Sequence, residues 1–98
     1  MSILPAIGEH IFHPTVCIRI KHNEDGGFTI THSPMNNMDE VNEYSASTAK
    51  AASAIIKSLM ATEIENCQAT IEQFSNSEYS TDWFAQHAAA CQAFLNSI

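Results

Sequence analysis

The sequence predicts an α+β domain in which an antiparallel β-hairpin, to which a third strand could add, packs on an antiparallel pair of α-helices. Two observations predict this fold. Every glycine and proline lies before residue 35, where polar and apolar side chains alternate, as in strands and turns. Twelve of the thirteen alanines follow residue 45, where larger apolar residues recur at the three- and four-residue steps of a helix. With 98 residues the chain fits one domain: strands over 1–34, a connector over 35–46 and a helical hairpin over 47–98.

The hairpin is predicted by two alternating segments, 15–22 and 28–32, on either side of a turn at 23–27. A three-residue loop with a left-handed glycine would place Ile20 opposite Ile30, whereas a two-residue loop would place Ile20 opposite Thr31. We prefer the three-residue loop, because the hairpin then has one apolar face. That face is expected to lie on the helices, since an isolated hairpin is marginally stable. Residues 3–13 remain ambiguous, and 8–12 could add an edge strand.

Two helices are predicted after residue 46. The first extends from about Ser47 to Phe74, or about seven turns, with Ser45 or Ser47 as its N-cap. Residues 75–80 interrupt the pattern, and Thr81 with Asp82 suits the start of a second helix that continues to the C-terminus. The short connection between them predicts that the helices lie antiparallel.

The charge balance excludes several classes of function. The chain has four Lys and Arg residues and eleven Asp and Glu residues, which gives a net charge of −7. Binding to nucleic acid or to an anionic membrane needs a basic cluster that this chain cannot assemble. There is no apolar run long enough to span a membrane, and the N-terminus does not resemble a signal peptide. We therefore expect a cytoplasmic protein, in which three widely spaced cysteines stay reduced.

Possible metal and thiol chemistry is weakly supported. His10 and His13 have a spacing that a metal pair can use, but spacing alone is a weak signal. His22 and His32 fall too far apart along the predicted hairpin to share a metal. Cys17 lies beside Arg19, which could lower its pKa, but no nearby base supports catalysis. We expect no catalytic residues, no metal and no cofactor, although a small-molecule ligand between hairpin and helices stays open.

One pair of ionisable residues lies near the predicted core. Glu63 falls beside the apolar stripe of the first helix, and His87 lies within that of the second. In an antiparallel helical hairpin they would come within about two turns of each other and could form a hydrogen bond. The simpler interpretation, which we prefer, is that Glu63 keeps its carboxylate in water and His87 is a satisfied core histidine.

Two surfaces are candidates for binding. The second helix carries no charge from residue 83 onward, and small neutral side chains let another element approach closely. Its expected interface residues are Trp83, Ala85, Gln86, Ala89, Gln92, Ala93 and Asn96. Acids form the other surface and would attract a basic protein. The expected acidic contact residues are Asp39, Glu40, Glu43, Glu65 and Glu72.

These features favour a small acidic protein, without enzymatic activity, that binds and blocks a larger protein or nucleoprotein. Its size and acidity suit the inhibitors of host defence that phages and mobile elements encode, such as anti-CRISPR proteins. The alternative is a homodimeric accessory or structural subunit joined through the uncharged helix. The sequence identifies no partner, and it does not decide whether that helix face is a dimer seam or a partner site.

Overall fold

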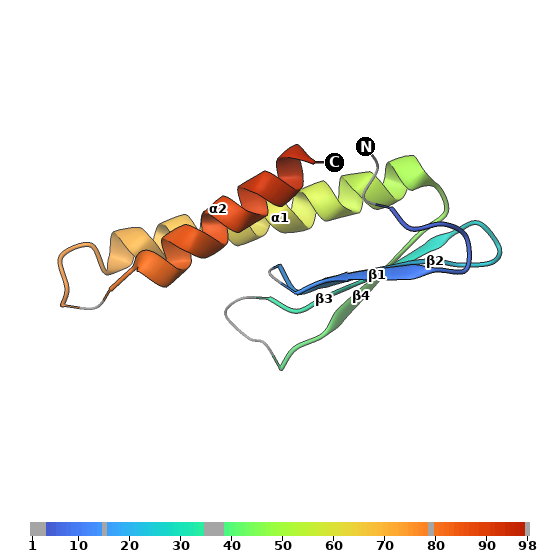
Figure 1. The fold of residues 1–98 in the computed structure, drawn as a ribbon. Helices are drawn as coiled ribbons and strands as arrows, with labels where there is room; N and C mark the ends of the chain where they lie inside the picture. The colour runs from blue at the N-terminus through green and yellow to red at the C-terminus, as the bar shows by residue number, and fades with distance from the viewer. Residues whose placement is uncertain (1–3, 15, 35–38, 79, 98) are drawn as a thin grey trace.

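Four strands and two helices form two layers in the computed structural model, as Figure 1 shows. The structure describes residues 4–14, 16–34, 39–78 and 80–97. A four-stranded antiparallel sheet makes one layer, and an antiparallel pair of helices covers one of its faces, which confirms the predicted fold class. The elements are β1 (His10–His13), β2 (Ile18–His22), β3 (Phe28–His32), β4 (Asn42–Ala46), α1 (Ala49–Gln73) and α2 (Asp82–Asn96).

The central hairpin of β2 and β3 has the predicted register. Ile20 lies opposite Ile30, as a three-residue loop requires. The amide of Asn23 donates to the carbonyl of Gly27 at 2.7 Å, and Gly26 has a φ of 93°, which glycine adopts without strain. The apolar side chains of the hairpin therefore all face the helices.

Two further strands extend the hairpin on both sides. β1 pairs with β2 and forms one edge of the sheet, so the possible third strand exists. β4 pairs with β3 and forms the other edge, within the segment 35–46 that was expected to be a connector. Tyr44 is the only large apolar residue of β4, so period-two alternation was too weak to identify a strand there. Residues 35–38 of that connector lie outside the described residues.

Both helices begin close to the predicted positions. α1 is 25 residues long, which is about seven turns. Its N-cap is Thr48, whose hydroxyl accepts from the amide of Ala51 at 3.1 Å, so the prediction of Ser45 or Ser47 was wrong. Ser45 is instead paired in β4. Thr81 is the N-cap residue of α2, as predicted, although its side chain makes no capping hydrogen bond.

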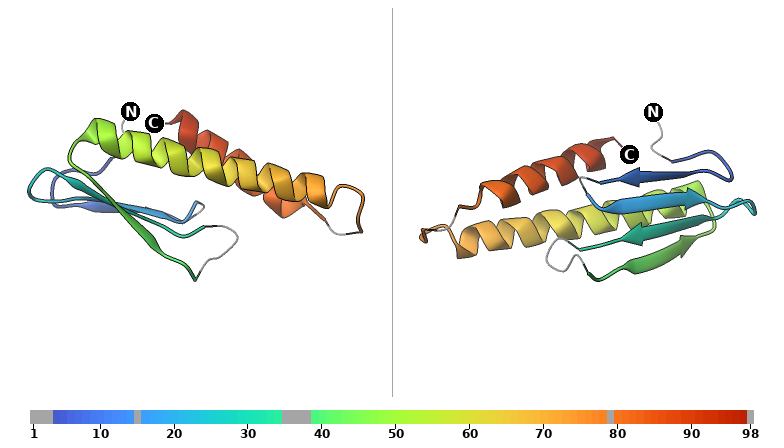
Figure 2. Two further views of the ribbon diagram at one scale, coloured as in Figure 1. Left: turned by 180° about the vertical axis from the view of Figure 1, so that it is seen from behind. Right: turned by 60° about the horizontal axis from the view of Figure 1, so that its bottom comes forward.

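The core lies between the sheet and the helical pair. Ile18, Ile20 and Ile30 contribute from the sheet, and Ile56 and Met60 from α1, all with no exposed surface. Beyond the ends of the strands the helical pair continues without a sheet beneath it (Figure 2), and the molecule measures 51 × 27 × 18 Å. Neither described helix is long and apolar enough to cross a membrane. The point where the helices leave the sheet holds the most unusual group of side chains.

Candidate functional site

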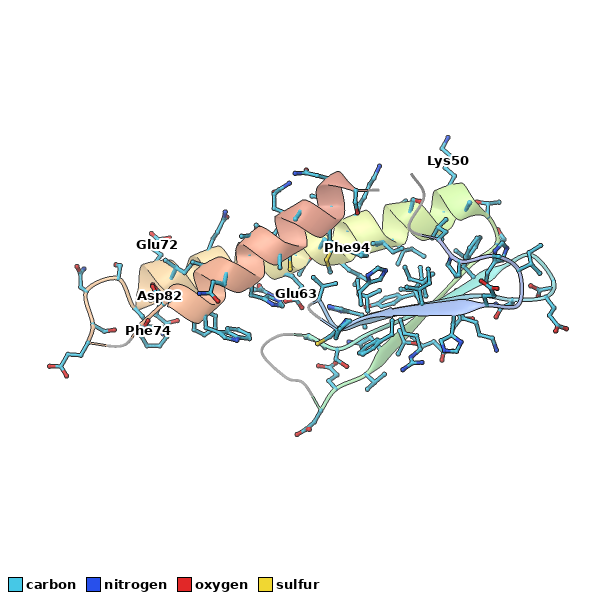
Figure 3. All side chains as sticks on the ribbon, in the orientation of Figure 1. Lys50, Glu63, Glu72, Phe74, Asp82 and Phe94 are labelled. Atoms are coloured by element: carbon cyan, nitrogen blue, oxygen red, sulfur yellow. The ribbon has the colours of Figure 1, made fainter. Side chains whose placement is uncertain are left out.

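A buried carboxylate lies between two imidazoles at the point where the helical pair leaves the sheet. Glu63 of α1 is only 3% exposed, and Figure 3 shows its side chain on the sheet side of the helices. Nε2 of His87, from α2, lies 3.3 Å from Oε2 of Glu63 in a hydrogen bond. Nε2 of His32, from β3, lies 3.2 Å from Oε1, although this contact lacks hydrogen-bond geometry. An ionised carboxylate only accepts, so Nε2 of His87 donates when Glu63 is ionised and the ring carries its proton on that nitrogen.

The contact between Glu63 and His87 was one of two alternatives that the sequence left open. The interpretation we preferred, a Glu63 carboxylate in water, was wrong, because α2 and β3 both cover that side of α1. Burying an ionised group is costly unless charged or hydrogen-bonding partners compensate for it. His87 supplies a hydrogen bond from α2, and His32 lies within ion-pair distance from β3, so the site depends on the packing of both layers.

The participation of His32 was missed by sequence reasoning. Its predicted position opposite Ile18 is correct. A signal existed, because Phe28, Ile30 and His32 share the inward face of β3, and a polar side chain on such a face needs a partner. Glu63 is the inward-facing acid of α1. His32 and Glu63 could therefore have been predicted as partners, because each is an ionisable residue on a face that is expected to be buried.

Burial and the Glu63 carboxylate both raise the pKa of all three cysteine thiols. Burial, and then the negative charge of Glu63, raises the pKa of the Cys17 and Cys67 thiols. The same causes, in the same order, raise the pKa of Cys91 to about 12. The proposed lowering of the Cys17 pKa by Arg19 was therefore wrong. Thiols of raised pKa are poor nucleophiles, so the cluster does not resemble a cysteine active site.

A pocket opens beside the buried carboxylate, between α1 and the β3–β4 side of the sheet. Its volume is about 500 Å³. Polar groups from both layers line it, together with the apolar side chains of Ile55 and Leu59. The remaining lining residues are His32, Pro34, Asn42, Tyr44, Ser58, Thr62, Glu63 and Asn66. The pocket therefore combines a short apolar wall with one buried acidic side chain among its described lining residues.

The remaining histidines lie apart from this group. His22 stacks on Phe28 with 4.1 Å between ring centroids, and its Nδ1 lies 3.0 Å from the carbonyl oxygen of Pro5. His10 is exposed on β1, whereas His13 is half-buried against Phe94. Within the described residues, no group of three or more His, Cys, Asp or Glu side chains is placed to hold a metal ion.

The five expected acidic contact residues are all exposed, but they occupy two regions. Asp39 and Glu40 immediately precede β4, and Glu43 lies on that strand at the free edge of the sheet. Glu65 and Glu72 lie on α1, and Figure 3 shows Glu72 pointing away from the sheet. The structure thus groups the three acids of the sheet edge and separates Glu72 from them.

The uncharged face of α2 lies on the surface. Each of its seven expected interface residues is exposed, and Trp83 retains 56% of its surface. Trp83 also stacks parallel to His87, with 5.2 Å between centroids and 4° between planes. This face therefore touches the buried group through one aromatic contact.

Comparison with known proteins adds no relative: no protein-family model matches the chain, and neither a curated protein nor a solved structure does so at a significant level.

Proposed function

We propose that this protein is a small acidic binding protein that covers a basic surface on a larger protein or nucleoprotein partner. The observation that carries this proposal is the free edge of the sheet, where Asp39, Glu40 and Glu43 are all exposed. Three acids on one edge, in a chain of net charge −7, would attract a basic partner over a long range and fix its orientation.

Its expected mode of action is inhibition by occupancy. An acidic edge that lies in a basic groove prevents nucleic acid from entering it, without any chemical step. Inhibitors of host defence carried by phages or mobile elements, of the anti-CRISPR kind, work on partners with such grooves. We place this action in the cytoplasm, an environment in which the three free cysteines would stay reduced.

The test is co-purification from a lysate of the source cell or its host, with the bound proteins identified by mass spectrometry at low and moderate salt. A variant with Asp39, Glu40 and Glu43 each replaced by Lys should lose the partner. The matched control replaces Glu9, Glu24 and Glu78, three other exposed acids, by Lys. It changes the net charge by the same amount and should keep the partner.

The two variants separate an oriented contact from general acidity. Loss of the partner with both variants would indicate that total charge alone matters. Retention with the edge variant would contradict the proposal, as would binding that does not weaken with added salt, because screening acts on exposed charges.

A second candidate function is that of a homodimeric accessory subunit joined through α2. It is favoured by the exposure of the uncharged face, since surface helices usually carry charges there. Ala89→Arg should then convert a dimer to a monomer in light scattering, whereas Ala61→Arg, at an exposed alanine of α1, should not. A wild-type chain of monomeric mass excludes this candidate.

A further inference from the structure

We propose that the pocket beside Glu63 binds a primary ammonium group carried on an aliphatic stem. This site borders the acidic sheet edge, because Asn42 and Tyr44 of β4 line it, but the proposal does not depend on the proposed function. The chemistry is shared by a small alkylamine and by a lysine side chain of a partner protein.

The charge of the pocket selects a cation. Glu63 supplies a carboxylate to the lining, and no Lys or Arg is among the described residues that line the pocket. Asp39 and Glu40 are exposed within three residues of Asn42, which lines it, so the surrounding field also attracts positive charge. Nε2 of His32 and Nε2 of His87 lie 3.2 and 3.3 Å from the two carboxylate oxygens. An ammonium ion would therefore share the carboxylate with these two rings.

The hydrogen-bonding groups suit an ammonium ion. An ammonium ion has three donors and no acceptor, and the pocket offers acceptors on several sides. Hydroxyl oxygens come from Ser58 and Thr62 on α1, and from Tyr44 on β4. Asn42 and Asn66 add amide oxygens on opposite walls. An ammonium ion beside Glu63 can thus meet the carboxylate and one or two neutral oxygens together, and hydrogen bonds to charged groups are the stronger kind.

The walls account for the aliphatic stem. Ile55 and Leu59 lie one helical turn apart on the pocket side of α1, and they are half-buried against the core. A volume of about 500 Å³ falls within the range of small-molecule sites, which combine apolar walls with a few placed polar groups. A stem of four or five methylene groups can lie along this wall while the cationic head reaches Glu63.

The experiment is a titration of the uniformly ¹⁵N-labelled full chain, followed by amide chemical shifts at neutral pH and low salt. The probes are n-pentylamine, its neutral analogue n-pentanol, and N-acetyl-lysine methylamide. Pentylamine should shift the amides of pocket residues such as Tyr44, Ser58 and Asn66 in a saturable manner, and pentanol should bind at least about tenfold more weakly. If the lysine amide binds as well as pentylamine, a partner's lysine is the source; if only pentylamine binds, the source is a free amine.

Variants connect the binding to the named groups. Glu63→Gln removes the charge and should weaken pentylamine binding at least about tenfold. Asn66→Phe leaves Glu63 intact and fills the pocket from an exposed position of α1, so it should also abolish binding. Gln68→Phe, at an exposed position of α1 outside the pocket, is the matched control and should bind normally.

Three results would overturn the proposal. The first is a lack of saturable shifts with either cation in the wild-type chain. The second is equal affinity for pentylamine and pentanol, which would identify a purely apolar pocket. The third is unchanged affinity in a folded Asn66→Phe variant. Because these outcomes concern only the pocket, they leave the co-purification test of the acidic sheet edge unaffected.

Discussion

The indole of Trp83 lies parallel to the imidazole of His87, with 5.2 Å between the ring centroids and 4° between the ring planes. One ring is exposed and the other is mostly buried against Glu63. His87 therefore connects a surface aromatic residue to the buried carboxylate, and a change at His87 should be detectable from Trp83.

Tryptophan fluorescence is expected to report the contact between Trp83 and His87. Trp83 is the only tryptophan of the chain, and the stacked imidazole covers one face of its indole. His87→Ala should remove that cover and shift the emission maximum to longer wavelength, while the far-ultraviolet circular dichroism stays constant. His10→Ala, at an exposed histidine of β1, should leave the emission unchanged. An unchanged emission in His87→Ala would show that the contact is absent in solution.

The buried carboxylate is expected to contribute to stability through its two imidazoles. Glu63→Gln keeps the size of the side chain but removes its charge, so the charge-assisted contacts to His32 and His87 are lost. The free energy of unfolding should fall by about 1–3 kcal/mol, as measured by urea denaturation at neutral pH. Glu65→Gln, at an exposed position of the same helix, should change it by less than about 0.5 kcal/mol. Equal effects would mean that the contacts do not stabilise the fold.

Much of the fold could be predicted because three segments have a clear apolar periodicity or clear turn and capping residues. The apolar alternation of β2 and β3, with glycines between them, determined a register that placed Ile20 opposite Ile30. The stripe of α1 and the Thr81–Asp82 start of α2 were equally clear. β4 was missed because its inward residues are one tyrosine, one asparagine and one alanine. Its pairing with β3 depends on tertiary contacts, which the strand propensity of the individual residues does not reveal.

The candidate site was harder to predict because its three members come from three elements. Antiparallel pairing of the two helices predicts that Glu63 and His87 lie at similar heights along the helix axes. Whether they touch depends on how each helix is rotated about its own axis, which the sequence does not give. His32 reaches Glu63 only because α1 packs on the inward face of β3, at the end of the sheet. Sequence pattern defines such faces separately and does not give their relative position, which is why the pocket of about 500 Å³ could not be predicted.

His13 is expected to make stability depend on pH. Burial lowers the pKa of this histidine from 6.5, so the unfolded chain binds a proton more readily than the folded one. The contribution of neutral His13 is therefore fully present above that value and is lost as the pH falls through it. Urea denaturation between about pH 8 and pH 5 should show this loss.

The matching control for His13 is the other histidine of β1. His13→Gln should give a flatter dependence of stability on pH than the wild type, since the titrating ring is gone. His10→Gln, at an exposed position, should leave the slope unchanged. Equal slopes for all three chains would show that His13 titrates alike in the folded and unfolded states.

The thiols are expected to react in an order set by burial. Cys91 has no exposed surface and a pKa of about 12, raised by burial and then by the charge of Glu63; Cys67 is also buried, and Cys17 is partly exposed. Because the thiolate is the reactive form, a disulfide reagent at mildly alkaline pH should modify Cys17 slowly and the other two only after unfolding. Glu63→Gln should speed the reaction at Cys17, because the carboxylate that raises its pKa is gone. Peptide mapping identifies the modified residue, and rapid labelling of Cys91 in the native chain would contradict the packing of α2 on α1.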